Sequence, residues 1–293
     1  MKFIETKFFI TFTILMVPVV FLYGDHLSGN YLNQILLFSL PLLWPGLAHG
    51  SLDLLVAKKN RLIKNKFQTF LFLFIYISIP LIFFYLWIIF PNIVFKIFLL
   101  LSILHFGISD SITSNKVIET LIRGFLVIIL PFKFHLEKTI DIFSFFYINE
   151  KELLNLSKYF DYLYIILILL ITFFLIQNYK KVFSYNKFSI FIIEIICLFF
   201  CFWFFEPLIS FFIYFCFLHS TRHLIDEKRN LELNKKNLFV KTLPMTMLTI
   251  IFFTSLFFYF NDNPNNLNIS ILVIGLSSLT IPHILLINFT KKD

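Results

Sequence analysis

Long apolar runs separated by short polar or proline-containing breaks dominate the chain. A membrane-crossing helix needs about 20 apolar residues, and ten runs come close to that length. This pattern predicts an all-α, polytopic integral membrane helix bundle of about ten transmembrane helices, with residues 1–293 as a single domain. The predicted helices cover residues 8–23, 31–49, 68–90, 93–110, 117–134, 159–178, 188–205, 207–224, 239–260 and 268–289.

Composition agrees with a membrane location. The 293 residues are 59% hydrophobic and 14% charged, whereas soluble domains have about 45–50% apolar and about 25% charged residues. So little polar surface excludes a water-soluble globule, and so much hydrophobicity excludes a disordered chain. The three cysteines lie in apolar runs and predict buried free thiols rather than a disulfide framework.

The net charge of +8 is distributed unevenly along the chain. With the N-terminus in the cytoplasm and alternating spans, twenty of the 25 Lys and Arg residues fall on the inner side. This asymmetry follows the positive-inside rule and predicts that both termini are cytoplasmic. The basic residues then serve as topology markers and require no nucleic-acid partner. The outer segment 135–158 is expected to contain a short interfacial helix.

Five of the seven histidines gather at one predicted depth. Each belongs to a span that runs from outside to inside, and each lies toward the cytoplasmic end of its span. Ionisable groups inside a membrane are costly, so they mark candidate functional sites. The five are His49, His105, His219, His223 and His283.

Spacing suggests that some of these histidines bind a metal. His219 and His223 are four residues apart, which places both imidazoles on one face of a helix. Together with His49 and His105 they form a four-imidazole set suited to a borderline divalent metal such as iron, zinc or copper. His283 follows Pro282 and is left open as a fifth ligand, a neighbour of the ligands or a substrate contact.

Carboxylates accompany the histidines in the sequence. Metal-bound imidazoles commonly donate their second N–H to a carboxylate. Asp53 follows His49 by four residues, Asp110 follows His105 by five and Asp226 follows His223 by three. Solvation of helix ends beside Lys and Arg is the alternative role for these three aspartates. Glu194 is flanked by Ile and Phe, which predicts a place in a buried polar network.

Two readings without catalysis compete with a metal enzyme. Histidines could hydrogen-bond between helices without any metal. A membrane transporter or channel for protons or metal ions could also use the histidine and acid cluster. Such a pathway predicts polar groups on both sides of the midplane, whereas the outer halves of the predicted spans are almost wholly apolar.

Four short motifs, in this order and spacing, resemble one known family. They are Pro45-Gly46-Leu47-Ala48-His49-Gly50-Ser51-Leu52-Asp53, His105-Phe106-Gly107 with Asp110, His219-Ser220-Thr221-Arg222-His223, and Pro282-His283. The set is similar to the bacterial Brp/Blh-type β-carotene 15,15′-dioxygenases. The resemblance implies a multi-pass enzyme of the bacterial inner membrane that cleaves the central double bond of β-carotene with O₂. It also implies Fe(II) as cofactor, with His49, His105, His219 and His223 as its ligands.

The implied chemistry agrees with an intramembrane site. β-Carotene and O₂ both dissolve in membrane lipid, and four histidines leave up to two iron positions open. Trp44, Trp203 and Tyr214 are candidates to stack on the polyene, with ordinary helix packing as the alternative. The two all-trans-retinal products could pass to a microbial rhodopsin. The chain itself lacks the mid-span lysine of a rhodopsin and the His-His pair of di-iron desaturases.

Overall fold

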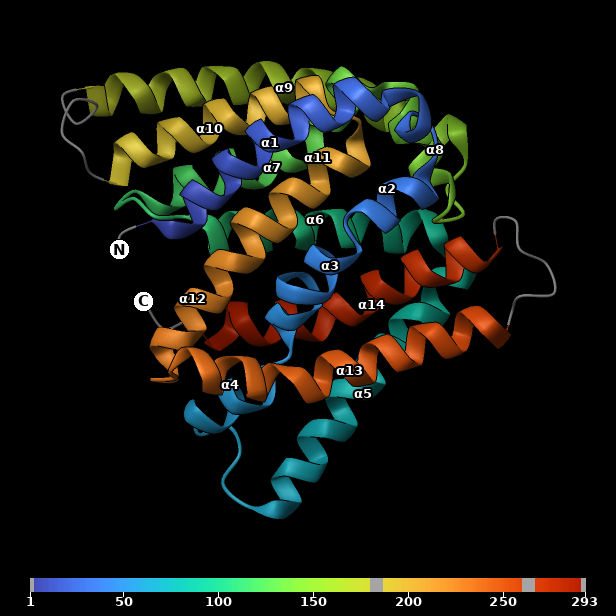
Figure 1. Cartoon of the computed structure of the whole chain (residues 1–293), viewed down its shortest axis with the longest axis vertical. Coiled ribbons are helices and arrows are strands. Elements are labelled where there is room, and N and C mark those ends of the chain that lie inside the picture. Colours follow the sequence, from blue (N-terminus) through green and yellow to red (C-terminus); the bar gives the residue numbers. More distant parts are fainter. Residues whose placement is uncertain (1–2, 180–186, 260–266, 291–293) are drawn as a thin grey trace. The chain divides into compact units, whose positions relative to one another are not determined.

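The computed structural model describes residues 3–179, 187–259 and 267–290. These residues form helices and no strand (Figure 1). The helices are α1 (Ile4–Leu27), α2 (Tyr31–Leu37), α3 (Ser39–Pro41), η1 (Leu42–Gly46), η2 (Leu47–Gly50), α4 (Asp53–Lys59), α5 (Lys66–Ile89), α6 (Pro91–Asp110), α7 (Lys116–Phe134), α8 (Leu136–Ser144), α9 (Glu150–Asn178), α10 (Lys187–Phe204), α11 (Pro207–Tyr214), η4 (Phe215–Ser220), α12 (Thr221–Asn230), α13 (Lys235–Tyr259) and α14 (Leu267–Thr290).

Seven segments among the described residues are long and apolar enough to cross a membrane. This confirms a polytopic membrane helix bundle, whereas the count of ten and the cytoplasmic termini stay predictions. The predicted span 117–134 is helical as α7 but is not among the seven, because Glu119, Arg123 and Lys133 interrupt its apolar sequence. The segment 135–158 contains the helix α8, and α9 begins within it at Glu150, whereas its outer, interfacial location stays a prediction.

The prediction of one continuous helix over residues 31–49 is wrong. The chain instead passes through α2, α3, η1 and η2. Pro45 has no N–H to donate to a helical hydrogen bond, and Trp44 adopts extended dihedral angles of φ −149° and ψ 119°. As a result, His49 lies on the short turn η2, and Asp53 begins a separate helix, α4.

A wide helical turn interrupts the segment that carries His219. The π-helix η4 lies between α11 and α12, and the hydroxyl of Thr221 donates to the carbonyl of Cys216 at 2.8 Å. A π-helical turn changes the rotation per residue, and such turns are frequent at functional sites. His219 therefore lies in η4 and His223 in α12, so the simple α-helical spacing of the prediction does not apply.

The chain forms two compact units. Unit 1 consists of Met1–Gly46, Ser102–Ile142 and Glu150–Arg222, and unit 2 consists of Leu47–Leu101, Phe143–Asn149 and His223–Asp293. Within unit 1, α7 packs against both α9 and α10, and α1 packs against α10 and η4; Figure 1 shows α1, α7, α9 and α10 in the same part of the unit. Within unit 2, α14 packs against α4, α5 and α13, and η2 contacts α13.

Glycine permits a close approach of two helices in unit 1. A Cβ added to Gly107 on α6 would lie 2.2 Å from the backbone oxygen of Thr120 on α7. One added to Gly124 on α7 would lie 2.0 Å from the backbone oxygen of Ile103 on α6. Small residues let helices in membranes pack at such short range. The pair Gly107 and Gly124 thus positions the end of α6 that carries His105 and Asp110.

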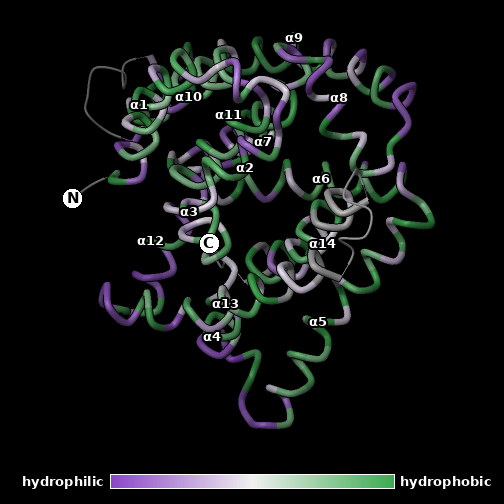
Figure 2. The backbone as a smooth tube through the Cα atoms, turned by 45° about the vertical axis from the view of Figure 1, so that its right-hand side comes forward, coloured by the Kyte–Doolittle hydropathy of each residue, from purple (hydrophilic) through white to green (hydrophobic). Residues whose placement is uncertain are grey.

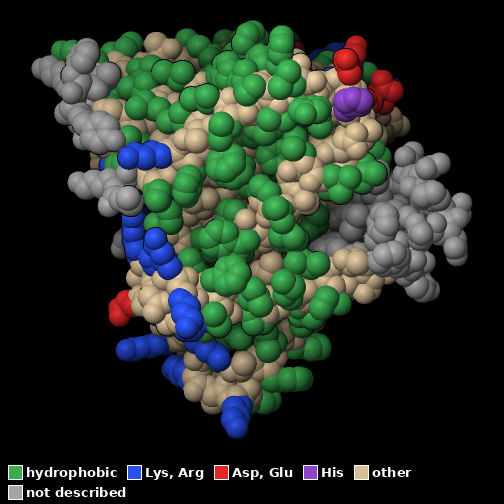
Figure 3. Space-filling view, in the orientation of Figure 1, with side chains coloured by type: hydrophobic (Ala, Val, Ile, Leu, Met, Phe, Trp, Pro, Cys, Tyr) green, Lys and Arg blue, Asp and Glu red, His purple; other side chains and the backbone are tan. Residues whose placement is uncertain are grey.

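The outward faces of the long helices are apolar. On α5, Phe70 is 68% exposed and Leu81 is 62% exposed. Figure 2 shows hydrophobic residues along most of α5 and hydrophilic residues on α12. In Figure 3, hydrophobic side chains cover most of the face drawn, and Lys and Arg gather near the ends of α4 and α12. Large exposed apolar surfaces of this kind mark a protein that contacts lipid.

In unit 1, hydrogen bonds to Glu206 connect the start of α11 with α2 and α8. Glu206 accepts hydrogen bonds from Lys138, from the side chain of Gln34 at 2.8 Å and from the backbone of Gly29 at 3.3 Å. Burial alone would raise the pKa of Glu206, but these donors outweigh it and hold the pKa below its ordinary value. Glu206 is therefore ionised at neutral pH and stabilises this end of the unit.

Candidate metal centre

Three buried imidazoles meet in unit 2, and we call them the His49 cluster: His49 on η2, His223 on α12 and His283 on α14. The ring centroids lie 4.8 Å apart for His49 and His283, and 5.0 Å apart for His223 and His283. Those of His49 and His223 lie 5.7 Å apart. Such a group of imidazoles could hold a metal ion.

A buried carboxylate supports the His49 cluster. Nδ1 of His283 lies 2.9 Å from both carboxylate oxygens of Asp53, and the hydroxyl of Tyr76 on α5 donates to Asp53 at 2.5 Å. Asp53 is only 3% exposed. Since a carboxylate accepts hydrogen bonds, Nδ1 of His283 is the protonated nitrogen in this contact. The sequence paired Asp53 with His49, whereas the structure places it on His283.

Two further imidazoles meet in unit 1. We call His105 on α6 and His219 on η4, together with their carboxylate Asp110, the His219 cluster. The ring centroids of the two histidines lie 5.1 Å apart, and the ring of Phe106 lies 4.8 Å from that of His219 in an edge-to-face arrangement. Both histidines are buried. This aromatic neighbour covers one side of the His219 ring with apolar surface.

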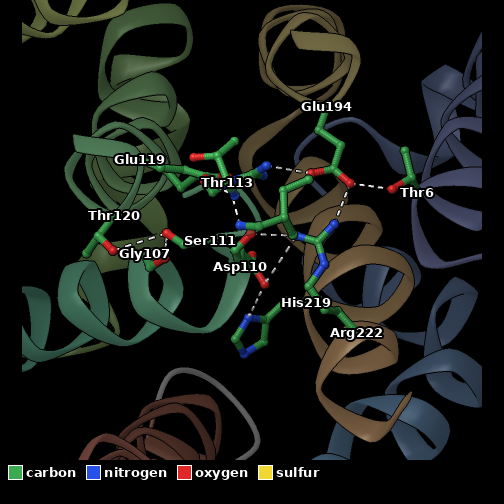
Figure 4. A network of polar contacts seen from close by, with 12 residues as sticks. Thr6, Gly107, Asp110, Ser111, Thr113, Glu119, Thr120, Glu194, His219 and Arg222 are labelled. Atoms are coloured by element: carbon green, nitrogen blue, oxygen red, sulfur yellow. Dashed lines mark hydrogen bonds and ion pairs between the residues drawn. The ribbon is translucent and has the colours of Figure 1, made fainter. Parts of the chain in front are cut away.

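Asp110 anchors the His219 cluster. Its Oδ1 lies 3.3 Å from Nδ1 of His219 (Figure 4). Its Oδ2 accepts a hydrogen bond from Tyr214 at 2.7 Å. The guanidinium of Arg222 donates to the backbone carbonyl of Asp110 at 2.8 Å. The acid predicted from its spacing to His105 therefore contacts His219. A carboxylate on Nδ1 orients the ring and favours Nε2 as the metal-binding nitrogen.

Glu194 on α10 lies at the centre of a buried ion-pair network in unit 1 (Figure 4). Its carboxylate pairs with Arg222 and also with Arg123, at 2.7 Å, and it accepts a hydrogen bond from Thr6. Arg123 also pairs with Glu119 at 2.8 Å. The network reaches His219 through Arg222 and Asp110, so it supports the imidazole on the side of its Nδ1 atom.

Of the other predicted site residues, Asp226, Trp44 and Trp203 lie nearer the surface, whereas Tyr214 is buried. Asp226 is partly exposed and pairs with Arg229 at 3.4 Å. The indole rings of Trp44 and Trp203 are exposed, at 44% and 59%. Tyr214 is buried against Asp110. All three cysteines are free thiols, as predicted; Cys201 and Cys216 are buried, whereas Cys197 is only partly buried.

Arg123, Arg222 and Tyr76 belong to these polar networks, but they were not among the predicted site residues. Arg123 and Arg222 were counted as inner-surface topology markers, but they are 1% and 3% exposed and ion-paired, which corrects that interpretation. The Thr-Arg-His motif that contains Arg222 was the available signal. Tyr76 contacts Asp53 from α5, and its polar hydroxyl inside a long apolar run could have marked it.

The donor chemistry of both clusters fits a borderline divalent metal. Imidazole nitrogens suit iron, zinc and copper, and in each cluster a buried carboxylate holds Nδ1 of one histidine. Such carboxylate contacts are the usual neighbours of metal-binding histidines. The described residues thus provide two groups of buried imidazoles that could bind a metal, each built within one unit.

Fold and site together define a polytopic helical membrane protein with buried histidine–carboxylate clusters. Residues 40–291 match the family model described as Beta-carotene 15,15′-dioxygenase, so the chain belongs to that family. A protein named Beta-carotene 15,15′-dioxygenase from the uncultured marine bacterium 66A03 is 26% identical over 252 residues, which cover 83% of this chain and 89% of the relative. No solved structure matches the chain. The family membership indicates an enzyme and confirms the resemblance of the motifs.

Proposed function

We propose that the protein cleaves the central 15,15′ double bond of β-carotene with O₂ at an intramembrane non-haem Fe(II) site. The carbon–carbon double bond and the O–O bond both break, and each new aldehyde receives one oxygen atom. The products are two molecules of all-trans-retinal, which balances atoms and electrons without another co-reactant. The observation that carries this proposal is the burial of two carboxylate-backed imidazole clusters in a chain of this family.

We assign His49, His105, His219 and His223 as the protein ligands of the iron. His49 and His223 belong to unit 2, and His105 and His219 belong to unit 1. When bound, Fe(II) supplies the electrons that activate O₂, which closed-shell side chains cannot do. Mutual proximity of His49 and His223 in unit 2, and of His105 and His219 in unit 1, supports this set.

The chain's own residues orient the ligands and exclude water. Asp110 fixes the ring of His219, and Tyr214 and Arg222 in turn hold Asp110. Glu194 fixes Arg222 by a buried ion pair. Phe106 supplies an apolar wall beside His219. A dry site of fixed geometry protects reactive oxygen chemistry from side reactions with water.

The environment suits the substrate. β-Carotene is a long hydrocarbon that stays in the bilayer, and the exposed apolar faces of the helices provide the contact with lipid. We place the protein in the bacterial inner membrane, where O₂ also dissolves. Transfer of retinal to a microbial rhodopsin in the same membrane completes the proposal.

Pigment loss tests the function. We expect expression of the chain in a bacterium that accumulates β-carotene to bleach the orange colour and produce retinal, measured by chromatography of the extracted pigments. A His219→Ala variant should leave the pigment intact, whereas His26→Gln, at a histidine outside both clusters, should bleach it fully. Unchanged pigment with folded wild-type protein in the membrane would contradict the proposal.

A further inference from the structure

We propose that His283 is an additional protein ligand of the metal, held in its ligating orientation by Asp53 and Tyr76. This inference rests on the proposed function, because it adds a residue to the same site. Every contact that carries it lies within unit 2, among η2, α4, α5, α12 and α14.

Distances place His283 centrally among the imidazoles. Two imidazoles that bind one metal at about 2.1 Å, with an angle of about 90–110° between them, have ring centroids about 4.5–5.2 Å apart. The separations of 4.8 Å from His49 and 5.0 Å from His223 fall in this range. The 5.7 Å between His49 and His223 is slightly longer. The ring separations therefore agree better with a metal shared by His283 and either neighbour than with a metal shared by His49 and His223 alone.

Ligating atoms in the cluster are also close. A ring nitrogen of His49 and one of His283 lie within 4.8 Å of each other, and both residues are buried. The ring of His283 rests on η2, where a Cβ added to Gly50 would lie 3.7 Å from its Nδ1. His283 thus packs directly against the turn that carries His49.

The carboxylate fixes which nitrogen can bind. Asp53 engages Nδ1 of His283 with both oxygens at 2.9 Å, which leaves Nε2, on the opposite side of the ring, as the ligating atom. Tyr76 donates to the same carboxylate at 2.5 Å and restricts its rotation. A hydrogen-bonded carboxylate behind an imidazole is a frequent arrangement at metal sites, and it raises the basicity of the ligand.

The buried carboxylate of Asp53 also supports His283 as a metal ligand. Asp53 is 3% exposed, and the neighbours identified for its carboxylate are a neutral tyrosine and an imidazole. Burying an ion is costly unless an opposite charge is close. A divalent cation on the far side of His283 would supply that charge through the polarised ring.

Metal titration of the purified full-length chain tests the inference. We expect wild-type protein, loaded anaerobically with Fe(II), to bind about one ion per chain. His283→Gln should weaken the apparent iron affinity at least tenfold and lower the number of imidazoles detected by X-ray absorption spectroscopy. Asp53→Asn should weaken affinity about ten- to a hundredfold, the range seen when such supporting partners are removed. His26→Gln, the matched control, should behave as wild type.

Each outcome decides one of the two proposals. Wild-type affinity and an unchanged imidazole number in folded His283→Gln would overturn the role of His283, while iron binding and retinal formation by wild type would leave the proposed function standing. Wild-type protein that binds no iron and forms no retinal would overturn the proposed function itself. If His283→Gln does not fold, Asp53→Asn carries the test because it keeps the imidazole, and unchanged affinity in that variant would overturn the inference.

Discussion

Glu194 is a single side chain on which both a buried ion-pair network and the orientation of His219 depend. Its carboxylate stands between two buried guanidinium groups, those of Arg123 and Arg222, and Arg222 contacts the acid that orients His219. Breaking a buried ion pair leaves an uncompensated charge, which costs far more than the loss of a pair at the surface. The network therefore links the stability of unit 1 to the geometry of the His219 cluster.

Replacing Glu194 with Gln should strongly destabilise the protein. We expect a loss of about 3–5 kcal/mol in unfolding free energy, because two buried arginines lose one counter-charge. Asp161→Asn is the control, since its pair with Lys133 is exposed and is worth about 0–1 kcal/mol. Denaturation in detergent micelles measures both. Equal stability of the two variants would show that the buried network contributes no more than a surface pair.

Close helix packing determines where the site residues lie. Gly107 lies two residues after His105 and three before Asp110, and its neighbour is the backbone of α7. Backbone cannot move aside as a flexible side chain can, so a larger residue must separate the two helices. Separation of α6 from α7 would displace both site residues on α6.

Gly107→Ala should therefore reduce both stability and metal binding. The added methyl group would lie 2.2 Å from the oxygen of Thr120, and overpacking of this kind costs about 1–3 kcal/mol or more. Gly24→Ala in α1 is the matched control, because its Cβ would meet no atom within 4 Å. Thermal unfolding and iron content report the two effects. A Gly107→Ala variant as stable and as iron-rich as Gly24→Ala would refute the importance of this contact.

At the scale of the whole molecule, hydrophobic runs predicted the helices well, because length and apolarity alone determine what can cross a bilayer. They failed at residues 31–49, where Pro45 and the extended Trp44 break the helix. Pairing of acids with histidines failed more often, because it depends on packing between distant segments. Asp53 and His283 are 230 positions apart, so no local spacing could join them.

Predicted depth selected histidines that the structure buries close together, and their role at a site stays a prediction. All five histidines selected by predicted depth are buried, and each lies beside another of the five. The roles of Arg123 and Arg222 could not be read from the sequence, because a basic residue near a helix end looks the same whether it faces solvent or a buried carboxylate. Only the packing of α7, α10 and α12 distinguishes the two cases.

Product analysis with the purified, Fe(II)-loaded protein tests the central claim most directly. β-Carotene in detergent micelles is supplied with O₂, and the carotenoid consumed and the aldehydes formed are quantified by chromatography. We predict two retinal molecules for each β-carotene consumed, because cleavage at the central bond gives two identical halves. No aldehyde, or aldehydes of unequal length, would contradict central cleavage by this protein.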